Sequence, residues 1–265
     1  DVGSGDATSL STVPESVRAK ALMVAREPLI IAGLEVAETV FREVNPTLEV
    51  RYVEKDGTRA IKGAVLMEIE GAAQSILTAE RVALNFVQRL SGVATATSLF
   101  VDAVRGTDAV ILDTRKTTPG LRLLEKYAVA CGDGKNHRTG LYDMILIKDN
   151  HLVALRDEEP NAIAAAVRRA REKYPNLKVE VEADTLKQFE QALEAGADVV
   201  LLDNMSLEDL KTAVKQNDGR AKLEASGGVN MLTVRGIAET GVDYISVGAL
   251  THSARAMDIA LDFHF

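Results

Sequence analysis

The pattern of apolar positions changes near Gly106. Before that point, apolar residues recur at helical spacing over residues 34–44, and a second, longer helix is predicted over residues 78–106, with Gly92 as a candidate interruption. Short strands are expected within residues 19–32, 50–54 and 65–69. This mixture predicts a first α/β domain over residues 1–106.

Beyond Gly106 the chain alternates regularly between strands and helices. The predicted strands are residues 109–113, 144–148, 178–182, 199–203, 222–225 and 244–247. The predicted helices are residues 121–130, 161–173, 186–195, 207–214 and 232–240. Such alternation indicates right-handed βαβ units and a parallel sheet. It predicts either a (β/α) barrel short of eight strands or an open doubly wound sheet, which give the same periodicity.

The last residues follow a different pattern. Met257, Ile259, Leu261, Phe263 and Phe265 alternate with polar or small neighbours, which is typical of a half-buried antiparallel strand. We therefore expect the tail, residues 256–265, to leave the second domain, residues 107–255, and to pair with the first domain.

Composition narrows the function. The net charge of −8 argues against a nucleic-acid or anionic-membrane surface, and no apolar run approaches a membrane span. The single cysteine, Cys131, excludes an intramolecular disulfide and is interpreted as an apolar filler, and together with the lack of a signal peptide it favours a cytoplasmic location. Residues 85–148 carry nine basic and six acidic side chains, which points to a small anionic ligand bound there.

Glycine turns and polar groups follow most of the predicted strands. A glycine turn that leads from a strand into a helix presents backbone N–H groups to a phosphate. Ser226-Gly227-Gly228 and the turn from Ser246 to Gly248 fit that pattern at the last two strands, and His252 follows closely. The alternative is that these glycines only permit tight turns.

Charged residues stand at the ends of the other strands. Arg115, Lys116, Arg138 and Lys148 could bind carboxylates or pair with surface acids. Lys148 ends an apolar strand, so a Schiff-base role is a further alternative. Glu182 and Asp203 end consecutive strands, where they would serve a Mg²⁺ carried by a polyphosphate or form salt bridges to Lys148.

An ordered set of motifs resembles the quinolinate phosphoribosyltransferase family. The motifs are RLSGVAT at 89–95, DTRKTTPG at 113–120, NHRTGLYD at 136–143, IKDNH at 147–151, EVE at 180–182, LDN at 202–204, SGG at 226–228 and SVGA at 246–249. The resemblance implies an N-terminal α/β sandwich joined by the C-terminal tail, and an incomplete parallel (β/α) barrel of six or seven strands. It also implies transfer of phosphoribose from phosphoribosyl pyrophosphate to quinolinate with loss of CO₂, a requirement for Mg²⁺, and a homodimer.

The resemblance also implies residue roles. The residues that match the quinolinate pocket are Thr114, Arg115, Lys116, His137, Arg138, Lys148 and, supplied across a dimer interface, Arg89. Those that match the catalytic groups are Lys116, Lys148, Glu182 and Asp203, the two acids also serving Mg²⁺, directly or through water. Those that match phosphate-binding loops are Ser226, Gly227, Gly228, Ser246, Gly248 and His252.

Three other hypotheses remain open at this point. A paralogue of the same fold that is related to molybdenum transport would accept a different acceptor. A barrel aldolase would use Lys148 as a Schiff base. A non-catalytic barrel would bind sugar phosphates without releasing pyrophosphate.

Overall fold

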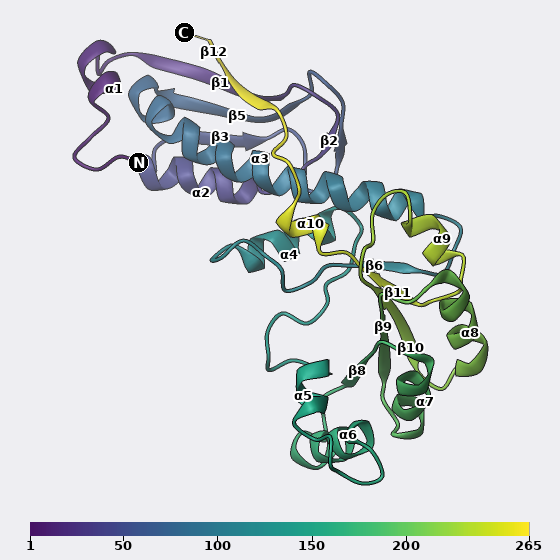
Figure 1. Ribbon diagram of the computed structural model, residues 1–265. Coiled ribbons are helices and arrows are strands. Elements are labelled where there is room, and N and C mark those ends of the chain that lie inside the picture. The colour runs from purple at the N-terminus through teal and green to yellow at the C-terminus, as the bar shows by residue number, and fades with distance from the viewer. Residues whose placement is uncertain (265) are drawn as a thin grey trace. The chain divides into compact units, whose positions relative to one another are not determined.

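The computed structural model describes residues 1–264 and divides into two compact units (Figure 1). The first unit comprises residues 1–98, 123–133 and the chain from 253 onward, and the second comprises residues 99–122 and 134–252. Phe265, the last residue of the predicted alternation, lies outside the described part of the chain. Among the described residues, no helix has both the length and the apolar character that a membrane span requires.

A four-stranded antiparallel sheet forms the centre of the first unit. Its strands, in spatial order, are β12 (Ile259–His264), β1 (Arg18–Ala25), β5 (Val65–Ala72) and β3 (Glu49–Tyr52). β12 pairs antiparallel with β1, with Leu261 opposite Met23, so the prediction that the tail joins the first domain is confirmed. Two short strands, β2 (Leu29–Ile30) and β4 (Arg59–Ala60), form a separate pair.

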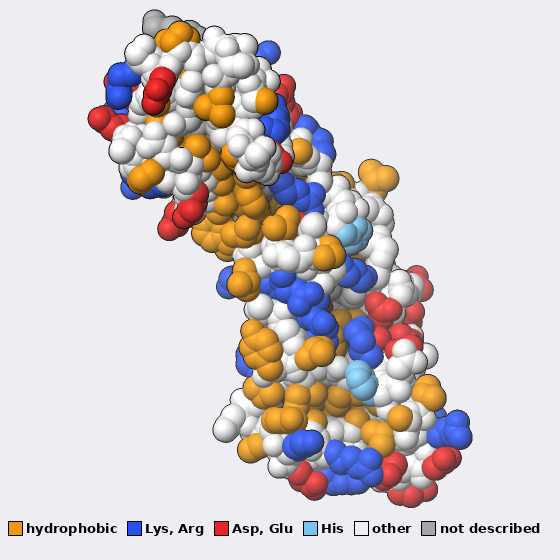
Figure 2. All heavy atoms as spheres, turned by 90° about the vertical axis from the view of Figure 1, so that its left-hand side faces the viewer, with side chains coloured by type: hydrophobic (Ala, Val, Ile, Leu, Met, Phe, Trp, Pro, Cys, Tyr) orange, Lys and Arg blue, Asp and Glu red, His pale blue; other side chains and the backbone are white. Residues whose placement is uncertain are grey.

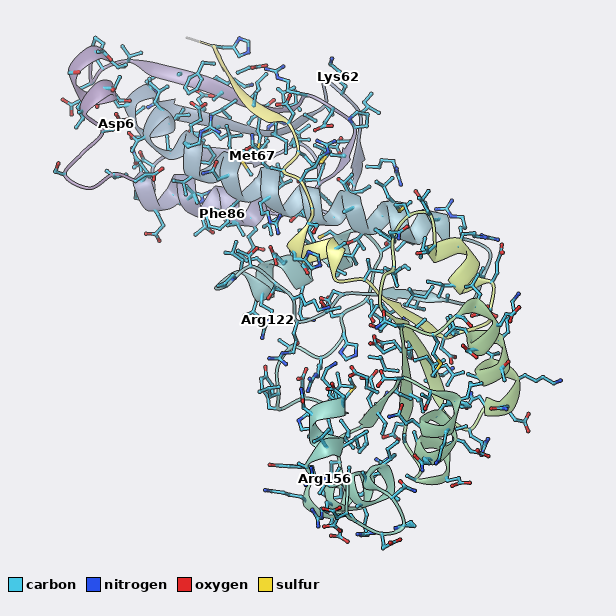
Figure 3. All side chains as sticks on the ribbon, in the orientation of Figure 1. Asp6, Lys62, Met67, Phe86, Arg122 and Arg156 are labelled. Atoms are coloured by element: carbon cyan, nitrogen blue, oxygen red, sulfur yellow. The ribbon has the colours of Figure 1, made fainter. Side chains whose placement is uncertain are left out.

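Helices supply the rest of the core of this unit. The elements are α1 (Ala7–Thr12), which Asp6 caps by accepting a backbone N–H (Figure 3), α2 (Leu34–Val44), the first part of α3 (Ala73–Ala103) and most of α4 (Arg122–Cys131). The buried residues Phe41, Met23 and Met67 belong to one apolar cluster, which joins α2 to the sheet. The observed bounds of α2 are those predicted from apolar spacing.

The prediction that Gly92 interrupts the long helix is wrong, because α3 runs unbroken through it. A Cβ at position 92 would lie 1.9 Å from the carbonyl oxygen of Arg255. Glycine is therefore needed at this position to let the C-terminal chain approach the helix.

A six-stranded parallel sheet forms the second unit. The strands are β6 (Val110–Leu112), β7 (Ile145–Ile147), β8 (Val179–Ala183), β9 (Val199–Asp203), β10 (Lys222–Ser226) and β11 (Tyr244–Ser246). The spatial order is β6-β11-β10-β9-β8-β7, so the first strand pairs with the last and the ring stays open between β6 and β7. This order is that of an incomplete barrel and excludes the doubly wound alternative, whose strand order reverses at a switch point.

Helices follow these strands along the chain: α5 (Asp149–Val153), α6 (Ala162–Lys173), α7 (Leu186–Glu194), α8 (Leu207–Asn217), α9 (Val234–Ala238) and α10 (Ala249–His252). In Figure 1, α7, α8 and α9 lie along one side of the sheet, as in a barrel. Side chains of Asn161, Thr185 and Ser206 cap α6, α7 and α8. The sequence pattern missed α5 and α10, because four or five residues are too few to show a helical period.

Candidate active site

Strand register brings the predicted polar residues to one side of the second sheet. Glu182 pairs across from Leu201, which pairs in turn with Glu224. Cross-strand partners point to the same side, and so do residues two apart along a strand. Leu201 lines a cavity, so Glu182 and Asp203 face the same side as that cavity.

This cavity, of about 310 Å³, opens at the carboxyl ends of the strands. Basic side chains dominate its polar lining: Arg115, Lys116, His137, Arg138 and Lys148. Its other polar lining residues are Thr114, Glu224, Ser226 and Ser246. In Figure 2, Lys and Arg side chains gather on the face of the second unit that is turned toward the viewer. The structure thus brings together eight of the predicted site residues around one hollow.

The loop after β6 is held from both sides. Arg122 (Figure 3) donates through Nη2 to the carbonyl of Arg115 at 3.3 Å and through Nη1 to that of Thr139 at 3.2 Å. The hydroxyl of Thr251 donates to the carbonyl of Lys116 at 2.8 Å. These hydrogen bonds fix the backbone of the loop, and so fix the positions from which the side chains of Arg115 and Lys116 extend.

The cations of the cavity are only partly neutralised within the second unit. Burial and the neighbouring Arg115 both lower the pKa of Arg138. Nε of Arg115 is buried and has no hydrogen-bond acceptor among the described residues. A buried donor without an acceptor costs free energy. An anion in the cavity would remove that cost, so the arrangement favours an anionic ligand.

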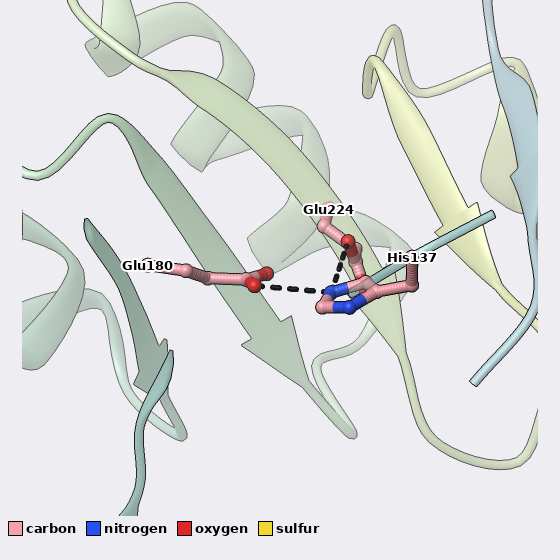
Figure 4. Close-up of side chains that lie close together, drawn as sticks. All are labelled: His137, Glu180 and Glu224. Atoms are coloured by element: carbon pink, nitrogen blue, oxygen red, sulfur yellow. Dashed lines mark ion pairs between the residues drawn. The ribbon is translucent and has the colours of Figure 1, made fainter. Parts of the chain in front are cut away.

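His137 forms a cluster with two carboxylates that come from different strands (Figure 4). Its Nε2 lies 3.0 Å from Oε2 of Glu180 on β8 and 3.4 Å from Oε2 of Glu224 on β10. Both carboxylates are buried. The backbone N–H of His137 donates at 2.7 Å to Asp113, which is buried at the end of β6.

Opposing influences act on the protonation of this cluster. Burial lowers the pKa of His137, while Glu180 and Glu224 raise it and outweigh burial. The N–H of Arg138 donates to Nδ1 of the ring at 2.8 Å, and this bond needs a lone pair that a second ring proton would occupy. The pKa of His137 is therefore raised, but by less than the carboxylates alone would raise it. Burial raises the pKa of Glu180 to about 7.

Lys148 and Glu182 form an ion pair at the ends of β7 and β8. The Lys148 side chain is 45% exposed and the Glu182 side chain 11%. Asp203, at the end of β9, accepts from the amide of Asn204 at 2.6 Å. The two acids fit a Mg²⁺ site completed by phosphate, because Mg²⁺ takes one or two carboxylates together with substrate oxygens and water.

The glycine turns meet a steric requirement. Gly227 has φ of +91°, and a Cβ there would lie 2.1 Å from Oδ1 of Asn204. A Cβ on Gly248 would lie 3.2 Å from both Nε2 of His252 and Cδ of Lys116. Gly248 thus lets the side chains of His252 and Lys116 lie close against the backbone of this turn. Gly227, Gly228, Gly248 and His252 lie outside the residues that line the cavity.

Arg89 lies on α3 in the first unit. It donates to buried Glu125 through Nε at 3.1 Å and through Nη2 at 2.7 Å, and to the carbonyl of Ala254 at 2.7 Å. Its side chain remains 25% exposed.

Sequence reasoning gave no role to Glu180 and did not single out Glu224. Glu224 carries a usable signal, since it is a charged residue between the apolar residues Leu223 and Ala225 in a predicted strand. A charge buried in such a strand requires a polar partner inside the barrel. The identity of that partner could not be read from the strand pattern.

The fold and the cavity define the class: an incomplete (β/α) barrel with a cation-lined, anion-binding site at its carboxyl end. Residues 6–91 match the family model for the quinolinate phosphoribosyl transferase N-terminal domain, and residues 93–262 match that for its C-terminal domain. The chain belongs to the quinolinate phosphoribosyltransferase family.

Named relatives agree with this assignment. The nicotinate-nucleotide pyrophosphorylase [carboxylating] of Mycobacterium leprae is 47% identical over 262 residues, covering 97% of this chain and 90% of the relative. The chloroplastic enzyme of that name from Oryza sativa is 44% identical over 272 residues, covering 97% and 72%. The nicotinate-nucleotide pyrophosphorylase structure from Francisella tularensis has a TM-score of 0.95 and 40% identity, covering 100% of this chain and 92% of that one.

Proposed function

We propose that the protein transfers phosphoribose from phosphoribosyl pyrophosphate to quinolinate and releases pyrophosphate and CO₂, forming nicotinate mononucleotide. The observation that carries the proposal is the cluster of cations around one cavity, including the buried Nε of Arg115 that has no acceptor among the described residues. Quinolinate carries two adjacent carboxylates on an aromatic ring. Arginine forks bind carboxylates in a bidentate manner and would hold this ring in a defined orientation.

The acids on the neighbouring strands supply the second half of the chemistry. When the C1–pyrophosphate bond of the ribose breaks, positive charge develops on the sugar, and Glu182 and Asp203 would stabilise it. The pyridine nitrogen then forms the new bond to C1. As CO₂ leaves, the electron pair of the C2–carboxylate bond stays on C2, where the positive charge of the adjacent quaternised nitrogen stabilises it, and a proton from solvent then binds C2. This sequence requires no enzyme nucleophile.

We also propose that Mg²⁺ acts with the pyrophosphate and is held by Glu182 and Asp203, directly or through water. When bound, the ion would neutralise charge on the leaving group. Lys116 and Lys148 would act beside it as point charges. The phosphate-binding turns in this proposal are those of Ser226-Gly227-Gly228 and Ser246 to Gly248, with His252.

We further propose a homodimer in which Arg89 completes the partner's site. Two inactive variants, Arg89→Ala and Lys148→Ala, test this by complementation. If Arg89 crosses the interface, each mixed dimer contains one site that carries neither substitution. Random assortment of equal amounts of the two variants makes about half of the dimers mixed, so about a quarter of the wild-type activity should return. No recovery after subunit exchange would contradict a shared site. The cytoplasmic location stays a prediction, since a plant relative is named chloroplastic.

The direct test is to incubate the protein with Mg²⁺, phosphoribosyl pyrophosphate and quinolinate labelled in the carboxyl group at C2. We expect CO₂, pyrophosphate and nicotinate mononucleotide in equal amounts, and none of them when phosphoribosyl pyrophosphate is omitted. Turnover of another acceptor without CO₂ would favour the paralogue hypothesis. A borohydride-stable adduct on Lys148 with a carbonyl substrate would favour the aldolase.

A further inference from the structure

The His137 ring stands between two hollows. His137, Arg138 and Glu224 line the 310 Å³ cavity and also a second cavity of about 240 Å³. Lys178, Lys222 and Tyr244 line only the second, which therefore lies toward the amino ends of the strands. A side chain between two cavities lacks packing neighbours on both sides, so van der Waals contacts alone hold it loosely.

Polar contacts hold this ring at both of its nitrogen atoms. Nε2 lies within ion-pair distance of Glu180 and Glu224, at 3.0 and 3.4 Å (Figure 4). Nδ1 accepts the backbone N–H of Arg138 at 2.8 Å. The ring thus joins two strands of the barrel to the backbone of a cavity-lining arginine. Neither oxygen of Glu180 has a hydrogen-bond partner among the described residues, and Oε2 is paired with His137 by charge at 3.0 Å. Its pairing with His137 is thus its principal polar contact.

We propose that Glu180 and Glu224 are positioning residues that hold the His137 ring by its Nε2–H and, through the ring, set the place of Arg138 in the cavity. This inference rests on the proposed function for its kinetic consequence. It does not rest on that function for the geometry of the ring. In this proposal both residues act through His137 and Arg138, and Glu180 lines only the second cavity.

Two other roles of the carboxylates make different predictions. If they served only as counter-charges for the cations, loss of either charge would make the cavity more positive and would strengthen the binding of a dianion. If they served only to fill the barrel, the ring would keep its place without them. The pair Glu180→Gln and Glu180→Ala separates these roles, because glutamine keeps an acceptor oxygen without the charge and alanine removes both.

The first readout is spectroscopic and needs no substrate. The protein has four histidines, so ¹⁵N-histidine labelling with a His137→Gln reference identifies the His137 Nε2–H signal. We expect this proton to exchange slowly with water in wild type and in Glu180→Gln, and its signal to be lost in Glu180→Ala. If Glu180→Ala does not fold by circular dichroism, Glu224→Ala replaces it. Persistence of the signal in the alanine variant would overturn the proposal.

The second readout is kinetic. We expect Glu180→Ala to raise the KM for quinolinate about tenfold while kcat and the KM for phosphoribosyl pyrophosphate stay within twofold, and Glu180→Gln to stay within threefold of wild type throughout. Glu70→Ala, at an exposed position of β5, is the control. Equal effects of Gln and Ala on KM would refute positioning in favour of charge. If wild type does not turn over quinolinate, the proposed function fails while the spectroscopic test of the ring still stands.

Discussion

Replacing Arg138 with methionine should separate binding from stability. Among the described residues, the guanidinium of Arg138 donates only one hydrogen bond, a long one of 3.4 Å from Nη1 to the carbonyl of Met144. Burial and Arg115 disfavour its charge. Methionine keeps the apolar stem, so the folded protein should gain about 0.5–1 kcal/mol from the loss of like-charge repulsion. For a chain of this size that gain raises Tm by roughly 1–4 °C.

The same substitution should nearly abolish quinolinate binding. Removing one partner of a desolvated charge pair costs about 2–5 kcal/mol, so the Kd for quinolinate should rise by a factor of roughly 30 to several thousand. Calorimetric titration with quinolinate measures the Kd, and differential scanning calorimetry measures Tm. Arg156→Met, with a side chain 77% exposed, is the control and should change neither. A Kd within threefold of wild type, or a fall in Tm of 5 °C or more, would refute this reasoning.

Three further predictions follow from the geometry of the second unit. Lys148→Met should lower kcat at least 100-fold in a CO₂-release assay yet shift Tm by less than about 3 °C, because the Lys148 end of its ion pair with Glu182 is 45% exposed and solvent screens such a pair to about 1 kcal/mol. A large loss of stability would contradict this prediction. Gly227→Ala should lower the free energy of unfolding in urea by about 2–3 kcal/mol, because φ at this position is +91° and the added Cβ would clash. The control, Gly236→Ala in α9, meets only ordinary contacts and should raise the free energy of unfolding by about 0.5–1 kcal/mol. Equal effects of the two substitutions would count against the turn geometry. Burial raises the pKa of Glu180, so wild type loses stability as pH rises through that pKa, and Glu180→Gln, which cannot titrate, should gain more stability over wild type at pH 8 than at pH 4 in urea unfolding. A difference of equal size at both pH values would show that this carboxyl is not responsible.

Much of the fold could be predicted because it is encoded locally. Apolar residues at helical spacing reproduce the bounds of α2, and the run at 199–203 reproduces β9. Each pattern reflects which face of a single element is buried, and neighbouring residues carry that information. The strand pattern also predicts that the glycines and charged residues at the ends of the strands lie together, since a parallel sheet gathers the carboxyl ends of its strands along one edge.

The remaining features depend on contacts between residues far apart in the chain. Periodicity could not distinguish a barrel from an open sheet, because that choice lies in the pairing of β6 with β11, more than 130 residues apart. Glycine at position 92 is typical of a helix break, but its place inside α3 depends on the carbonyl of Arg255, which lies against it. His137 meets Glu180 and Glu224 only because three separate segments converge inside the barrel. Local spacing records which side of an element is buried, and strand pairing and packing determine which residues meet there.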